Sequence, residues 1–62
     1  MNDVYIVEIT SVDDYVYERY KGEDEIEARK IYNEFTIRKN LKKVELYKKI
    51  IIEITQKETK LF

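Results

Sequence analysis

The chain has 62 residues, of which 44% are hydrophobic and 40% are charged, and its formal net charge is −1. This length predicts a single domain, residues 1–62, whose core rarely yields more than about 3–5 kcal/mol of stability. Because the chain has no cysteine and no histidine, it lacks disulfides, the common ligands of zinc and the commonest general base, so we expect no cofactor, no metal site and no enzyme activity.

The first two predicted elements are strands. Residues 4–10, VYIVEIT, are rich in β-branched and aromatic side chains, and a polar turn follows them. Residues 15–21 alternate in a way that puts Tyr15, Tyr17 and Arg19 on one face. Since the linker is short, the two strands are predicted to pair as an antiparallel hairpin.

A helix is predicted to begin just after Gly22, the one glycine of the chain. Asp24 and Glu27 have the spacing of a capping box at the start of this helix. Arg38 and Lys39 supply positive charge at its other end, where the helix dipole favours cations.

The predicted helix has one apolar stripe. Its members follow the spacing i, i+3, i+4, i+7 and are Ala28, Ile31, Tyr32 and Phe35. Ile26 and Ile37 lie almost opposite this stripe, so one sheet cannot bury both sets. They are either isolated exposed side chains or part of a second contact surface.

The second half of the chain predicts a further strand over residues 44–54, VELYKKIIIEI, with alternate apolar side chains. Because this segment exceeds the usual strand length, we expect a bulge or bend near Lys48 and Lys49, or a break into two strands. Residues 56–62 are predicted as a tail that is polar up to Leu61 and Phe62, which dock either on the body of the protein or on a partner. The predicted fold class is α+β, a three- or four-stranded antiparallel sheet with one helix packed on one face, in the order ββαβ or ββαββ.

The tyrosines predict a contact surface, because a single helix covers only one face of such a sheet. Whichever side chains face the helix, aromatic rings remain on the other face. Tyrosine is tolerated in water, but it is also enriched in interfaces. Since so small a core gives little stability, we expect a homodimer with an interface on this face. The candidate interface consists of Tyr15, Tyr17, Arg19, Tyr47, Lys49 and Ile51.

The charge is divided along the chain. Residues 1–27 carry nine acids and two bases, a charge of −7, and residues 28–62 carry ten bases and four acids, a charge of +6. Acidic and basic elements either lie beside each other, in one fold or across a homodimer, or the basic half contacts nucleic acid. On an edge strand, lysines also protect against aggregation. The candidate basic patch consists of Arg38, Lys39, Lys42, Lys43, Lys48 and Lys49.

The start of the chain, MNDVYIVEIT, lacks the basic segment of a secretory signal. No apolar run is long enough to span a bilayer. We therefore expect a cytoplasmic protein that does not bind membranes.

The chain resembles the short proteins encoded by phages and mobile elements of AT-rich bacteria. The resemblance is carried by its many Ile, Lys, Glu, Asn and Tyr residues, by the hairpin-helix-strand plan and by the segment VELYK at 44–48. Proteins of that type are often host-takeover factors or inhibitors of bacterial defence systems such as restriction and CRISPR. The resemblance implies a non-catalytic module that binds a host protein stoichiometrically in the host cytoplasm. The alternative is a small nucleic-acid-binding accessory protein.

Overall fold

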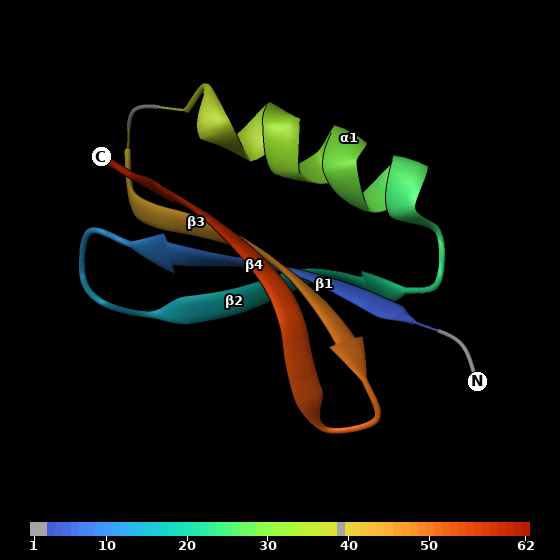
Figure 1. The fold of residues 1–62 in the computed structure, drawn as a ribbon. Helices are drawn as coiled ribbons and strands as arrows, with labels where there is room; N and C mark the ends of the chain where they lie inside the picture. The colour runs from blue at the N-terminus through green and yellow to red at the C-terminus, as the bar shows by residue number, and fades with distance from the viewer. Residues whose placement is uncertain (1–2, 39) are drawn as a thin grey trace.

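The computed structural model describes residues 3–38 and 40–62 of the chain (Figure 1). In chain order the elements are β1 (Val4–Ser11), β2 (Val16–Gly22), α1 (Glu25–Thr36), β3 (Leu41–Ile50) and β4 (Glu53–Leu61). The strands form one sheet in the order β2-β1-β3-β4, with every neighbouring pair antiparallel. The helix α1 lies across one face of this sheet (Figure 1). The predicted α+β class is confirmed, in its four-stranded form ββαββ.

The core lies between α1 and the two central strands. Directly opposed residues of antiparallel strands share a face, so the pairing of Val7 with Leu46 and of Ile9 with Val44 places these side chains together on the helix side. The stripe predicted for the helix is confirmed, because Ala28 is buried and the other three members pack against the core. The buried core residues are Tyr5, Val7, Ile9, Ala28, Leu41, Val44 and Leu46.

The helix begins where the capping pattern predicts. The Asp24 side chain is the N-cap, and its Oδ1 accepts a hydrogen bond from the Glu27 backbone N–H at 3.2 Å. Ile26 and Ile37, the residues opposite the stripe, are 82% and 81% exposed, so α1 packs on the sheet through a single face. Arg38 lies beyond the end of α1, with its guanidinium 4.7 Å from the centre of the Phe35 ring.

The prediction of a polar tail over residues 56–62 is wrong, because residues up to Leu61 belong to β4. Every residue of β4 is exposed. A strand with water on both sides has no apolar alternation, which is the signal on which strand prediction depends. The predicted break of the 44–54 segment is confirmed, since β3 ends at Ile50 and β4 begins at Glu53. The register of these two strands also shifts between Lys48 and Lys49, where a bulge was predicted.

The position of β3 corrects one interpretation of its lysines. Lys48 and Lys49 do not lie on an edge strand, since β3 pairs with β1 on one side and with β4 on the other. These lysines therefore do not protect a free edge. The sheet is bordered by β2 and β4 instead.

Candidate functional site

A bulge in β2 decides where the tyrosines lie. Tyr20 is opposite Val7, whereas Glu18 is opposite Glu8, so Arg19 is an extra residue in β2. Tyr17, opposite Ile9, therefore shares the helix side with Tyr20, although strict alternation predicts opposite faces. The Arg19 guanidinium lies 5.5 Å from the centre of the Phe35 ring on α1, so Arg19 also lies on the helix side.

The residues of the candidate interface do not form one surface. Tyr17 and Arg19 lie on the helix side of β2, and Tyr15 is exposed beside the β1–β2 turn. Tyr47 is opposite Ile6 on the face away from the helix, here called the open face. Lys49 shares that face, and Ile51 lies in the β3–β4 turn. Ring pairs are therefore not available as one docking face.

The open face is covered by charged side chains around Glu45. This carboxylate is buried, and it binds Lys57 Nζ at 2.7 Å and Lys43 Nζ at 3.3 Å. Burial by itself raises the pKa of Glu45, but the hydrogen bonds from Lys57 and Lys43 outweigh burial and leave that pKa below its ordinary value. The group is therefore a carboxylate at neutral pH.

Tyr47 belongs to the same network. Its hydroxyl donates a hydrogen bond to Glu8 Oε1, and Glu45 Oε1 lies 3.4 Å from the hydroxyl. Burial, followed by the contact with Glu8, raises the pKa of Tyr47. The ring is half-buried, and the Lys57 ammonium lies 5.4 Å from its centre. Tyr47 is therefore one of the polar side chains that cover the open face. Its half-buried ring is not exposed for stacking on a nucleic-acid base.

The residues of the candidate basic patch are also divided. Lys43 and Lys49 lie on the open face, but Lys48 is opposite Tyr5 on the helix side. Lys42 pairs with Asp14. Lys43 pairs with Glu45, and Lys48 pairs with Asp3 at 3.3 Å. Lys39 lies outside the described residues, and Arg38 stacks on Phe35. Acidic and basic segments therefore lie beside each other in one fold. This agrees with the first interpretation of the divided charge and not with a basic half that is free for nucleic acid.

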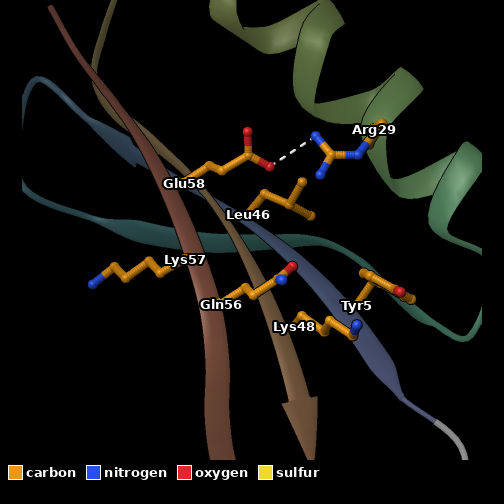
Figure 2. A pocket seen from close by; sticks show the side chains of 7 residues that line it. All are labelled: Tyr5, Arg29, Leu46, Lys48, Gln56, Lys57 and Glu58. Carbon is orange, nitrogen blue, oxygen red and sulfur yellow. Dashed lines mark ion pairs between the residues drawn. The ribbon is translucent and has the colours of Figure 1, made fainter.

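Two pockets lie in the described part of the chain, and they are either very small or widely open to solvent. The first has a volume of about 10 Å³, room for about one water molecule. Figure 2 shows the Arg29 side chain reaching across it from α1 to Glu58 of β4, with 2.8 Å between Arg29 Nη1 and Glu58 Oε2. The second, of about 290 Å³, is open and lies beside the Asp14–Lys42 ion pair and Leu61.

Residues 3–38 and 40–62 contain neither a cluster that could bind a metal ion nor a helix that could span a membrane. Three glutamates, Glu18, Glu8 and Glu45, are aligned across the open face, but no group of three or more acidic, histidine or cysteine side chains there could hold a metal ion. Nor does this part of the chain contain a helix with the length and apolar character needed to cross a membrane.

Four exposed isoleucines lie at and beside the β3–β4 turn. Ile50, Ile51, Ile52 and Ile54 are 37%, 72%, 85% and 51% exposed, and we call these four residues the isoleucine tip. In Figure 1 the tip projects away from α1 and from the β1–β2 hairpin. Loop ends are normally polar, so an apolar cluster at this position is unusual.

The backbone of the isoleucine tip is strained. Ile51 has φ = 59°, in the left-handed region. A β-branched residue is an outlier in this region, at a cost of roughly 1–2 kcal/mol, and two-residue hairpin turns ordinarily use glycine, asparagine or aspartate for such a conformation. Strain of this kind persists where other demands outweigh stability, most often at functional sites. Exposure and strain therefore point to the same residues.

Replacing Ile51 by glycine is expected to stabilise the protein. Glycine adopts a positive φ without strain but loses more backbone entropy on folding. The net gain is about 0.5–1 kcal/mol, and 1 kcal/mol corresponds to a rise in Tm of about 4–8 °C in a domain of this size. Thermal unfolding followed by circular dichroism measures the change. The matched control is Ile52→Gly, at a neighbour without a positive φ; an equal gain from both variants would contradict the strain at Ile51.

Sequence reasoning named only Ile51 from this tip. The alternation over 44–54 places Ile50, Ile52 and Ile54 on the apolar face of a predicted strand, with a break into two strands as the alternative. No local signal marks a turn at Ile51 and Ile52, because isoleucine favours strands and hairpin turns favour glycine, asparagine or aspartate.

The comparisons with known proteins gave no relative. No protein-family model matches the chain, and neither the curated proteins nor the solved structures yielded a match.

Proposed function

We propose that the protein is a non-catalytic binding module that inserts its isoleucine tip into an apolar pocket of another protein. The observation that carries this proposal is the exposure of four isoleucines at the end of a projecting hairpin whose backbone is strained at Ile51. Burying a fully exposed isoleucine side chain yields about 1.5–3 kcal/mol. Two such side chains contribute about 3–6 kcal/mol to a protein contact.

The proposed partner is a bacterial host protein, and the proposed effect is the stoichiometric obstruction of a defence system by a phage-encoded homodimer. The resemblance to short phage and mobile-element proteins supports this partner by analogy. The absence of histidine and cysteine supports binding over catalysis. The thin core of a chain this short supports association with a second copy. The host cytoplasm is the proposed location.

Affinity capture from a nuclease-treated bacterial lysate tests the proposed tip. The wild-type chain is expected to retain one protein in a fixed ratio, and Ile52→Lys is expected to reduce that retention at least roughly tenfold, since a charge in an apolar pocket is strongly unfavourable. The matched control is Ile37→Lys, an equally exposed isoleucine away from the tip.

Two outcomes would contradict the tip proposal. One is a partner that Ile37→Lys releases and Ile52→Lys retains. The other is a partner that disappears on nuclease treatment, which would favour the nucleic-acid alternative. That alternative has less support because Lys42, Lys43 and Lys48 already pair with acids of the same chain.

A further inference from the structure

The outer edge of β4 is a free pairing edge. β4 lies at one border of the sheet and all nine of its residues are exposed. Its bulge lies near the turn: Gln56 is opposite Lys48 and Ile54 is opposite Lys49, so Thr55 is the extra residue. Residues 56–61 therefore continue in regular register. The other border strand, β2, carries its bulge in the middle, at Arg19, and a bulge is a common device that blocks pairing at an edge.

The orientation of the main chain in β4 follows from one hydrogen bond. The Phe62 N–H donates to the Lys42 carbonyl at 3.1 Å, so residue 62 directs its main-chain groups toward β3. In an antiparallel ladder such residues alternate with residues whose N–H and C=O point the other way. Lys57, Thr59 and Leu61 therefore present their main-chain groups at the outer edge.

We propose that two copies of the chain pair antiparallel through this edge of β4, with a two-fold axis at Thr59. Thr59 is then opposite Thr59 of the second copy, and Lys57 is opposite Leu61 of the second copy. All of these residues present their main-chain groups outward. The result is one continuous eight-stranded sheet, with the two helices on the same side.

Charge complementarity supports this register. Glu58 and Lys60 lie on the helix side of β4, opposite Leu46 and Val44. About an axis at Thr59, Glu58 of each copy faces Lys60 of the other, which gives two attractive cross-strand pairs. Arg29 already binds Glu58 from above (Figure 2), so each carboxylate would lie between two cations.

Registers with the axis at Lys57, Glu58 or Lys60 are unfavourable. An axis at Glu58 places two glutamates opposite each other, and an axis at Lys57 or at Lys60 places two lysines opposite each other. Like charges directly opposed across strands are destabilising. Thr59 is the uncharged position between them, and threonine pairs across strands are favourable.

This dimer deepens the proposed function, on whose homodimer it rests. An antiparallel pairing places the two isoleucine tips at opposite ends of the joined sheet. The axis lies about seven residues from each turn, and a strand rises about 3.3 Å per residue, so the tips are on the order of 50 Å apart. A dimer of this shape suits a partner that repeats or is itself two-fold symmetric.

Two charge-reversal variants test the register, with masses in solution measured by sedimentation and by native mass spectrometry. Lys60→Glu alone places glutamates at both cross-strand positions, and Glu58→Lys alone places lysines there. Each variant is expected to dissociate roughly tenfold more readily than the wild type, because two attractive pairs become repulsive. An equal mixture of the two variants restores both attractive pairs and is expected to form a heterodimer. The control is Lys30→Glu, on the exposed face of α1, which leaves association unchanged.

The outcomes separate this inference from the proposed function. A wild-type chain that is monomeric at hundreds of micromolar overturns the homodimer and the β4 edge together. A wild-type dimer that both variants leave intact, or a mixture that does not associate, overturns the β4 register alone. Because the mixture measures a gain of association, poor folding of one variant would not imitate the expected result. Capture through the tip is scored independently with Ile52→Lys.

Discussion

Replacing Ile9 by alanine is expected to unfold most of the protein at room temperature. Ile9 is buried on the helix side of β1, in the core that α1 covers. Truncation of a buried isoleucine to alanine costs about 2–5 kcal/mol. That loss is comparable to the whole stability, about 3–5 kcal/mol, that a core of this size supplies. Urea denaturation followed by far-ultraviolet circular dichroism measures the loss at a fixed protein concentration, since self-association adds to apparent stability.

The matched control for this prediction is Ile26→Ala. Ile26 is an exposed isoleucine on the opposite side of α1, and surface substitutions usually change stability by less than about 0.5 kcal/mol. Alanine also has the higher helix propensity. Equal losses from Ile9→Ala and Ile26→Ala would contradict the placement of the core between α1 and β1.

The second large effect is expected from Lys57→Met, which removes the nearest cation from the buried Glu45 carboxylate. Lys43 alone then remains beside Glu45. Leaving a buried polar group short of a partner costs about 1–3 kcal/mol, so the variant is expected to lose stability in that range at pH 7. Lys49→Met is the control on the same open face, since no ion pair of Lys49 is found within residues 3–38 and 40–62.

The pH dependence of Lys57→Met follows from the lowered pKa of Glu45. In the wild type, the carboxylate stabilises the fold above the pKa of the unfolded chain, about 4.3, and this stabilisation is lost as the pH falls through the lower folded pKa. Without Lys57, burial raises the pKa of Glu45 toward or above its unfolded value. The stability difference between wild type and variant is therefore expected to shrink from pH 7 to pH 3. A difference that stays constant over this range would show that Lys57 acts through packing alone.

Lys57 is informative for a second reason, because it lies on the strand proposed to join two copies. Its side chain points to the open face, away from α1 and from Glu58 (Figure 2). Its role toward Glu45 is therefore separate from the cross-strand pairs of Glu58 and Lys60. A loss of stability in Lys57→Met that leaves the dimer intact would agree with both parts of the structure.

At the isoleucine tip, stability and partner binding are expected to make opposite demands on the sequence. Ile51→Gly is expected to raise stability, whereas Ile52→Lys is expected to reduce partner binding. A residue that lowers stability and is kept at an exposed position indicates a demand other than folding. This combination is the usual cost of a binding surface built on a small scaffold.

Local patterns predicted the elements whose stability comes from local interactions and from one buried face. The N-cap Asp24, the stripe of α1 and the strand character of β1 follow from spacings of a few residues. The four-stranded α+β fold was among the predicted forms for the same reason. β4 was missed because its residues are exposed on both faces and so carry no periodic signal.

Tertiary contacts decided everything that depends on register. An extra residue in a strand reverses the face of the side chains beyond it, so the bulge at Arg19 places Tyr17 and Tyr20 together on the helix side, whereas alternation puts them on opposite faces. Local sequence patterns also could not predict the ion-pair partners of the lysines, since Lys42 and Asp14 are 28 residues apart in the chain. Composition and short spacings therefore reveal the strands and the helix that have a buried face. The surface they form together depends on strand pairing, because that pairing alone sets which side chains become neighbours.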